Sequence, residues 1–419
     1  MLDNQASPRV FRYRLLLIAA LFFSSWGRSG LRSDARYGAE SDHTKTGIDV
    51  LEEQRFPALR GKRVGLITNQ TGVDSRGRRT IDVLAHAEGV KLVAIFSPEH
   101  GIAGKIEDTR VADTTDTTTE LPIYSLYGET RRPTAEMLAN LDALVFDIQD
   151  AGVRFYTYIT TMGYAMEEAA KRHIAFFVLD RPNPLGGEVI EGPMLDRDRL
   201  SFVGYFPMPV RYAMTLGELA QMFNAENKIG AELHVIAMKN WRRGEFFSET
   251  GLSWIPPSPN LRTLDETFLY PGVEPLQAGG VSVGRGTAKA FEFVGATWLE
   301  PSVEFAGELE RRQVPGVRFF AAGITPRDGP YAGRMCHGVF AFVTDRTVFR
   351  SIPMGIEIAD ALQRMYPKQF QLEKIIFLLG SQTTIDRLER GDAVKDIVDG
   401  WVPDLDKFRA MRQKYLIYH

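Results

Sequence analysis

Polar side chains follow four predicted strands in the first half of the chain, each at the point where the strand ends. The strands are Val64–Thr68, Leu92–Phe96, Leu144–Phe146 and Phe176–Leu179, and the clusters that follow them are Asn69-Gln70-Thr71-Gly72, Ser97-Pro98-Glu99-His100-Gly101, Asp147-Ile148-Gln149-Asp150 and Asp180-Arg181-Pro182-Asn183-Pro184. The carboxyl ends of parallel strands meet at one edge of a sheet, and ligands bind at that edge. Buried parallel strands are otherwise apolar. The sequence therefore predicts an enzyme site there.

Glu99 and His100 are the first candidates for chemistry, because a carboxylic acid beside an imidazole can move protons. Cleavage of a glycosidic bond uses one carboxylic acid to protonate the leaving oxygen and a second carboxylate to activate water or attack the sugar. Pro98 stiffens the exit of the strand and favours a fixed position for Glu99. The structural alternative is a simple turn, with Glu99 capping the next segment.

Asp147 and Asp150 end the third strand and are followed closely by Arg154, Tyr156 and Tyr158. Repulsion among neighbouring carboxylates raises the pKa of one of them, which suits a general acid. We take Asp150 as the first candidate for the second catalytic group and Asp147 as the next. The structural alternative is an Asp147–Arg154 ion pair with Asp150 as a helix cap.

Further polar residues are candidate substrate ligands. Arg181 brings a fork-shaped cation that can hold a carboxylate, and the neighbouring prolines fix where Arg181 and Asn183 point. Arg285 lies between two glycines in Val283-Gly284-Arg285-Gly286-Thr287, which lets its side chain reach the site from the second half of the chain. Further candidate substrate ligands are Asn69, at the first strand end, and His100, Arg154, Tyr156 and Tyr158. The structural alternative for Arg181 is a pair with Asp180 or Asp150 in a rigid turn.

Cofactor and metal sites are weaker interpretations. Neither the Asn69–Gly77 turn nor the Arg285 segment has the G-x-G-x-x-G or Walker spacing, which disfavours a nucleotide. Glu99, His100, Asp147, Asp150 and Asp180 are residue types that bind Mg²⁺ or Zn²⁺, so a metal-dependent hydrolase stays an alternative. The chain has seven histidines and no H-E-x-x-H, and we expect neither a metal nor a cofactor.

Composition places the chain among ordinary globular proteins. Its 419 residues are 44% hydrophobic and 25% charged, with a net charge of −3, so nothing favours nucleic acid or an anionic membrane surface as a partner. Cys336 is the only cysteine, which excludes an intramolecular disulfide and predicts a small buried hydrophobe.

Residues 1–30 have the order of a secretory signal. Arg9, Arg12 and Arg14 precede an apolar run from Leu15 to Phe23, and small residues follow at Ser24, Ser25 and Gly27. The run is short for a membrane span, which takes about 20 apolar residues. We expect a cleaved signal peptide, or else an N-terminal anchor, and an exported protein, periplasmic or extracellular, with no stable membrane span after processing.

The rest of the chain predicts a linker over residues 31–46 and then an α/β fold in two domains. Strands alternating with helices over 47–229 predict a parallel sheet, and the capping box Thr215–Glu218 predicts its last helix. Residues 230–419 predict a second domain of strands and helices, of the α/β (α+β) class. Two long segments without periodicity, 103–132 and Trp254–Pro275, are predicted as a lid or binding loop and as a segment that crosses the first domain's crevice. In the second domain the predicted strands are Leu233–Met238, Phe291–Val294, Val317–Ala321 and Val339–Thr344.

Taken together, many segments of the chain resemble one family. They include VGLITNQTGVD, FSPEHGI, LPIYSLYGETRRPTAEML, FDIQDAGVRFYTYITTMGYAMEEA, VLDRPNPLGG, PVRYAMTLGELA, WIPPSPNL, YPG and VSVGRGT. They cover almost the whole length after residue 47, less densely after Trp298, and are specific only as a set. On them the chain resembles the NamZ-type (YbbC-like) exo-β-N-acetylmuramidases of bacterial cell-wall recycling.

The resemblance implies a glycoside hydrolase that releases N-acetylmuramic acid from the non-reducing end of peptidoglycan fragments, so that muropeptides or disaccharides are the expected partners. It implies a Rossmann-like domain with a smaller C-terminal domain closing a cleft. It also points to the glutamate of S-P-E-H-G, Glu99 here, as a catalytic acid. For the lactyl carboxylate of muramic acid, the candidate ligands are Arg154, Arg181 and Arg285. A non-catalytic protein that binds cell-wall sugars is the other alternative.

One segment departs from the family pattern. Many relatives carry an acidic Phe-Glu-Gly-type segment between YPG and VSVGRGT, where this chain has Val273–Gly280 with Gln277. An amide is not a base, so either Glu274 substitutes for that acid or the position is structural. The sequence does not decide between retention and inversion of configuration, which follows from the separation of two carboxyl groups.

Overall fold

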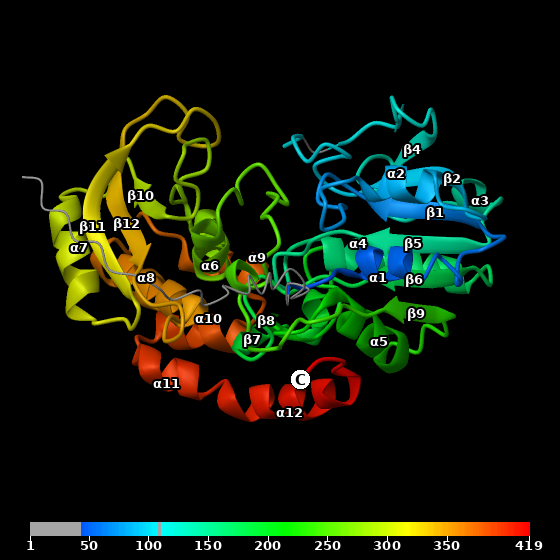
Figure 1. Cartoon of the computed structure of the whole chain (residues 1–419). Helices are drawn as coiled ribbons and strands as arrows, with labels where there is room; N and C mark the ends of the chain where they lie inside the picture. The colour runs from blue at the N-terminus through cyan, green and yellow to red at the C-terminus, as the bar shows by residue number, and fades with distance from the viewer. Residues whose placement is uncertain (1–42, 108–109) are drawn as a thin grey trace, which may run out of the picture. The chain divides into compact units, whose positions relative to one another are not determined.

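The computed structural model describes residues 43–107 and 110–419, and the predicted signal segment 1–30 and most of the linker lie outside these residues. The first part of the described chain forms a seven-stranded sheet in the order β3-β4-β2-β1-β5-β6-β9. Only β3 is antiparallel to its neighbour. The strands are β1 Arg63–Thr68, β2 Lys91–Ser97, β3 Thr114–Thr115, β4 Pro122–Ser125, β5 Ala143–Asp147, β6 Ala175–Leu179 and β9 Leu233–Ile236. Figure 1 shows this sheet with its helices. The predicted Rossmann-like fold is confirmed.

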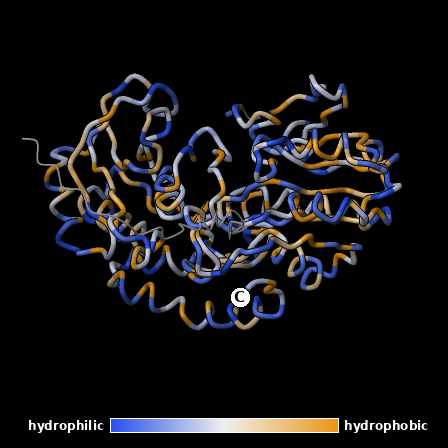
Figure 2. Tube along the Cα trace, viewed as in Figure 1, coloured by the Kyte–Doolittle hydropathy of each residue, from blue (hydrophilic) through white to orange (hydrophobic). Residues whose placement is uncertain are grey.

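The sheet is hydrophobic on both faces because alternate residues of its strands enter two different cores. In β5, Ala143 and Val145 pack with helices α1 and α2, whereas Leu144 and Phe146 pack with α4 and α5. The apolar strands are visible in Figure 2. Helices of this part are α1 Gly47–Glu53, α2 Thr80–Ala85, α3 Ala135–Leu138, α4 Tyr158–Ala170 and α5 Leu216–Glu226. The strand order reverses between β1 and β5, which is where a doubly wound sheet has its ligand crevice.

The second part is built on a three-stranded antiparallel sheet in the order β10-β12-β11, with α7 packed against it. The strands are β10 Phe293–Ala296, β11 Val317–Ile324 and β12 Cys336–Val343, and a separate ribbon pairs β7 Glu191–Met194 with β8 Pro209–Arg211. The helices are α6 Leu264–Val273, α7 Ser302–Arg311, α8 Ser351–Met365, α9 Ile376–Leu379, α10 Gln382–Glu389, α11 Val394–Asp399 and α12 Val402–Arg412.

The two parts share one hydrophobic core. The cluster that contains Ile159 and Phe223, on the α4–α5 face of the large sheet, continues through Phe268 and Leu276 to Phe305 under the small sheet. Helices α6 and α8 pack closely at Gly272 and Gly355, where any side chain would overlap the facing backbone. Both walls of the site described below are therefore fixed by one packing arrangement.

Some predicted elements need correction. Leu233–Ile236, assigned to the second domain, is the edge strand β9 of the large sheet, paired with β6. Segment 103–132 contains β3 and β4, and Trp254–Pro275 contains α6, so neither is without structure. Helix α2 begins after its N-cap Arg79, and the hydroxyl of its first residue, Thr80, donates to Asp147. Cys336 is buried and free, as predicted.

Candidate active site

A cavity of about 470 Å³ lies between the loop after β2 and the loops of the small sheet. This volume is in the range of small-molecule sites, which are about 300–1,000 Å³. From the first part of the chain Glu99, His100, Glu107 and Tyr127 line it. From the second part it is lined by Gln277, Val281, Ser282, Val283, Arg285, Pro326, Asp328, Gly329, Pro330 and Tyr331. The cavity therefore brings together chain segments more than 200 residues apart in sequence.

Glu99 is half-buried on the turn that leaves β2. The turn closes through His100 and Gly101, which both have a left-handed backbone, with φ of 69° and 72°. The Thr157 hydroxyl, at the N-cap of α4, donates to Glu99 Oε2 at 2.5 Å and makes no capping bond to its own helix. Glu99 is thus oriented at the cavity wall from two elements.

The charge of Glu99 acts on three tyrosine side chains. Burial raises the pKa of Tyr127, and the charge and hydrogen bonding of Glu99 raise it further. Burial likewise raises the pKa of Tyr158 and Tyr270, and the charge of Glu99 adds to both shifts. These phenols stay protonated at neutral pH and are therefore hydrogen-bond donors.

His100 lines the cavity with one ring nitrogen already committed. Its Nδ1 lies 2.7 Å from the carbonyl oxygen of Ile106. A carbonyl only accepts, so Nδ1 carries the proton and Nε2 is the nitrogen left for a ligand.

Glu107 is a carboxylate that the sequence analysis did not single out. It lines the same cavity as Glu99 and accepts a hydrogen bond from the buried Asn260. Asn260 belongs to the segment after Trp254, whose Pro256 and Pro257 carbonyls accept from Gln70 and Tyr158 at 2.8 and 2.6 Å. That segment therefore lies across the edge of the large sheet, as predicted.

Glu274 and Arg285 form an ion pair at the cavity. Arg285 Nη2 donates to Glu274 Oε1 at 2.6 Å, and the two side chains are 32% and 13% exposed. Burial raises the pKa of Glu274, Arg285 lowers it, and the charges of Glu107 and Glu99 raise it. Gln277 lines the cavity, and its Oε1 has no hydrogen-bond partner among the described residues.

Asp147 and Arg181 lie elsewhere, in a buried pair at the ends of β5 and β6. Arg181 Nε and Nη2 donate to Asp147 at 2.6 and 2.9 Å, and the Thr80 hydroxyl donates at 2.5 Å. Arg181 also donates to the Val73 carbonyl. The Asp147 side chain is 0% exposed. The expected partner Arg154 is replaced by Arg181, and the position of the pair does not support catalysis by Asp147 or substrate binding by Arg181.

Asp150 is buried behind the cavity and accepts hydrogen bonds from Tyr212 and from the Gly152 amide. Burial raises its pKa to about 6. The raised pKa was predicted, but desolvation causes it rather than a neighbouring carboxylate. Asp180 is also buried, with its pKa raised to about 6 by burial, and accepts from Thr215 and Tyr418. Neither acid lines the cavity.

Arg154 and Asn183 are structural in position. Arg154 is 0% exposed and donates to the carbonyls of Leu378 and Leu379 at 2.9 and 2.7 Å, and to those of Pro193 and Met208. Burial lowers its pKa to about 9. Asn183 donates to the Met214 carbonyl at 2.9 Å and accepts from the Leu185 amide. Both were predicted as substrate ligands, but both are buried and bind backbone groups of the chain itself.

Asn69, Tyr156 and Tyr158 form a buried layer near Glu99. Asn69 Nδ2 donates to the Tyr158 hydroxyl at 3.0 Å, and the two tyrosine rings pack edge to face at 4.7 Å. Tyr158 is 1% exposed. These predicted substrate ligands support the cavity from behind without lining it.

The acids do not assemble as metal ligands. Within residues 43–107 and 110–419 no group of three or more His, Cys, Asp or Glu side chains is arranged to hold a metal ion. The five residues considered from the sequence are distributed over separate sites, with Asp147 bound to Arg181 and Asp150 to Tyr212.

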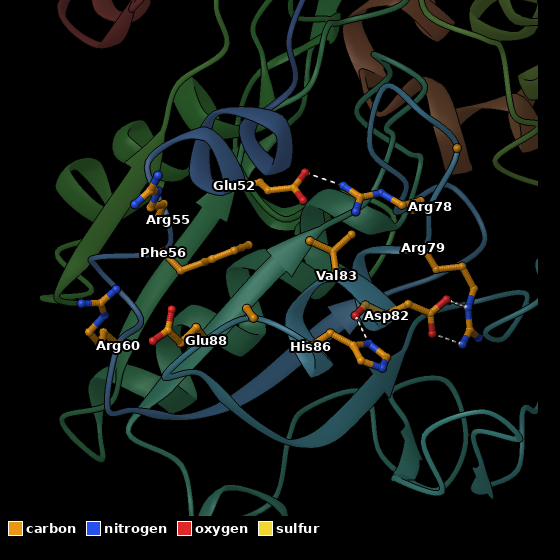
Figure 3. A pocket seen from close by; sticks show the side chains of 12 residues that line it. Glu52, Arg55, Phe56, Arg60, Arg78, Arg79, Asp82, Val83, His86 and Glu88 are labelled. Carbon is orange, nitrogen blue, oxygen red and sulfur yellow. Dashed lines mark hydrogen bonds and ion pairs between the residues drawn. The ribbon is translucent and has the colours of Figure 1, made fainter.

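A second cavity, of about 630 Å³, lies on the α1–α2 face of the large sheet (Figure 3). Its acids serve the chain itself: Glu52 pairs with Arg78, and Asp82 pairs with Arg79 at 2.6 Å. His86 Nδ1 lies 2.8 Å from the Asp82 carbonyl. No residue predicted for the site lines this cavity, so the Glu99 cavity is the candidate active site.

Comparison with known proteins identifies relatives of the chain. A curated relative, the peptidoglycan beta-N-acetylmuramidase NamZ of Bacillus subtilis (strain 168), is 44% identical over 384 residues, which are 91% of this chain and 92% of the relative. Two crystal structures of DUF1343 family proteins from Bacteroides fragilis NCTC 9343 match with TM-scores of 0.84 and 0.72 at 40% and 29% identity. Each match covers 90% of this chain and 99% of the solved one.

Two family models cover nearly all of the described chain. The N-terminal model, exo-beta-N-acetylmuramidase NamZ, matches residues 64–265, and its C-terminal counterpart matches residues 268–418. The chain belongs to the NamZ family of exo-β-N-acetylmuramidases.

Proposed function

We propose that the chain is a glycoside hydrolase that removes N-acetylmuramic acid from the non-reducing end of peptidoglycan fragments, with Glu99 as its general acid. The observation that carries this is the position of Glu99: alone among the acids predicted from the sequence, it lines the cavity. The family and the curated relative support the reaction and the substrate class.

The mechanism follows from which carboxyl groups reach the cavity. Protonated Glu99, held by Thr157, gives its proton to the glycosidic oxygen as the bond to the anomeric carbon breaks. Glu107 replaces Asp150 as the candidate for the second carboxylate, since it lines the same cavity. In that role it takes a proton from the water whose oxygen bonds to the anomeric carbon. Tyr127 and His100 Nε2 are available to position the sugar.

The test is hydrolysis of two defined disaccharides, N-acetylmuramic acid linked to N-acetylglucosamine and the reverse, with product detection. We expect free N-acetylmuramic acid only from the first, with or without EDTA. Loss of activity in EDTA would favour a metal-dependent hydrolase. Binding without any released sugar would favour a sugar-binding protein and would contradict the proposal.

Export is the second part of the proposal. The basic residues, apolar run and small residues within positions 1–30 support a signal peptide and a periplasmic or extracellular location. In the described part of the chain, no helix is long and apolar enough to cross a membrane. Cell fractionation with and without residues 1–30 tests this, and retention of the full chain in the cytoplasm would contradict it.

A further inference from the structure

The arginines that the sequence offered for the carboxylate of muramic acid are occupied. Arg154 donates to four backbone carbonyls, and Arg181 is paired with Asp147. Arg285 reaches the cavity but is paired with Glu274. A substrate that carries a carboxylate into a cavity already lined by Glu99, Glu107 and Asp328 needs an uncompensated positive charge nearby.

Arg131 supplies such a charge beside the catalytic wall. Its guanidinium lies over two aromatic rings, 5.4 Å from the centre of Tyr127 and 4.2 Å from that of Phe202. The side chain is exposed and has no ion-pair or hydrogen-bond partner in the part of the chain that the structure describes. Its neighbour Arg132 also lies over a ring, that of Tyr164, but is paired with Glu167 at 2.6 Å. Arg131, unlike Arg132, is therefore positioned by aromatic rings while its guanidinium N–H groups have no partner among the described residues.

Tyr127 interacts with both Arg131 and the proposed catalytic acid Glu99. Its hydroxyl interacts with Glu99, and its ring carries Arg131. Arg131 is not among the residues that line the cavity, but Tyr127, which does line it, contacts the Arg131 guanidinium and interacts with Glu99. Aromatic stacking fixes the orientation of a guanidinium while leaving its edge free to bind a carboxylate in two hydrogen bonds.

We propose that Arg131 binds the lactyl carboxylate of N-acetylmuramic acid and thereby sets the preference of the site for this sugar. The inference rests on the proposed function and deepens it: the substrate class is a hexosamine that carries an anionic ether substituent. Arg131 is a specificity residue and takes no part in proton transfer.

The test compares an aryl β-glycoside of N-acetylmuramic acid with the same compound after conversion of its lactyl acid to the uncharged amide. Wild-type protein should prefer the acid, and R131Q should reduce that preference in kcat/KM by about 10- to 100-fold, chiefly through KM. R131K, which keeps the charge, should recover part of it. The control is R60Q, because Arg60 is exposed, lies at the cavity of Figure 3 and has no ion-pair partner among the described residues.

Equilibrium binding separates this inference from the proposed function. Calorimetry of free N-acetylmuramic acid and N-acetylglucosamine with the E99Q protein should show a preference for the acid that R131Q removes. If wild-type protein hydrolyses neither glycoside, the proposed function fails, while binding still tests Arg131. Loss of the preference in R285Q but not in R131Q would overturn the inference, as would an effect of R131Q confined to substrates with a peptide on the lactyl group.

Discussion

Polar residues gather at two places on the same edge of the large sheet, and only one of the two has a sizeable cavity. At the reversal of strand order between β1 and β5, the crevice is filled by the Asn69–Gly72 turn and the Arg181 side chain. About 70 Å³ remains there, against about 470 Å³ beside β2 at Glu99. Asp147 at the first place accepts hydrogen bonds from Arg181 and Thr80, whereas Glu99 accepts from Thr157, interacts with Tyr127 and lines the open cavity.

The difference shows what a polar strand end needs in order to become a binding site. The segments that cover it must leave its polar side chains without hydrogen-bond or ion-pair partners from the chain itself. Asp147 meets a guanidinium and a hydroxyl, and Asp180 meets two hydroxyls and two amides. Buried charges need such partners, and once they have them they have no capacity left for a substrate. Glu99 instead faces loops of the small sheet that leave a cavity.

The largest expected effect is on the open side. Replacement of Glu99 by Gln keeps the shape and the hydrogen bond from Thr157 but removes the proton, so kcat should fall by about 10³-fold. Thermal unfolding should be unchanged within about 2 °C. The measurement is hydrolysis of a muramic-acid aryl glycoside, and a wild-type rate for E99Q would refute the assignment.

On the closed side the expected effect is on stability. R181M leaves the Asp147 carboxylate buried without its cation, which should cost about 3 kcal/mol of unfolding free energy in a denaturant titration. Folded R181M should still hydrolyse substrate. K407A is the matched control: its pair with Asp404 is exposed, and its removal should cost less than about 1 kcal/mol. If R181M were as stable as wild type but inactive, Arg181 would belong to the active site rather than to the buried structural pair.

The buried Asp150 should make the stability of the protein depend on pH. Its pKa of about 6 lies above the usual 3.8, so the folded protein holds a proton that the unfolded chain releases. Stability from this group is complete below about pH 4 and is lost as the pH rises through about 6, by about 2–3 kcal/mol in total. D150N has no such proton, so its stability relative to wild type should rise over this interval. Parallel curves for both proteins between pH 4 and 7 would contradict the expectation.

The smallest expected effect is at Thr157, which contacts Glu99 without touching substrate. T157V keeps the volume and removes the donor, and should lower kcat by about 10-fold while leaving KM nearly unchanged. T157S, which keeps the hydroxyl, should recover most of the rate. Because the hydroxyl makes no capping bond to α4, stability should change little. Equal kcat for T157V and T157S would show that the contact is incidental.

The strands could be predicted because their pattern is local. β1, β2, β5 and β6 were predicted within about one residue at each end, since buried parallel strands read as apolar runs ended by polar clusters. Glu99 could be found for the same reason, as the acid on a stiff turn after such a run.

The rest of the site could not be predicted from short segments of the sequence. Glu107 and Tyr127 lie in a segment without periodicity, and only packing against residues such as Asn260 brings them to the cavity. Arg154 has the sequence environment of a ligand, but two of the four carbonyls that bind it are 224 and 225 residues away. Whether an arginine is occupied depends on tertiary partners that no spacing encodes.

The core that runs beneath both sheets has a consequence for how such enzymes can change. A cavity whose two walls rest on separately packed modules can be altered by exchanging one module for another. In this protein an exchanged part would bring core side chains that do not pack against the remaining part. The resulting misfit in the shared core would also move the catalytic acid. New specificity in this architecture is therefore accessible mainly through single side chains on surface loops, and much less through recombination of its halves.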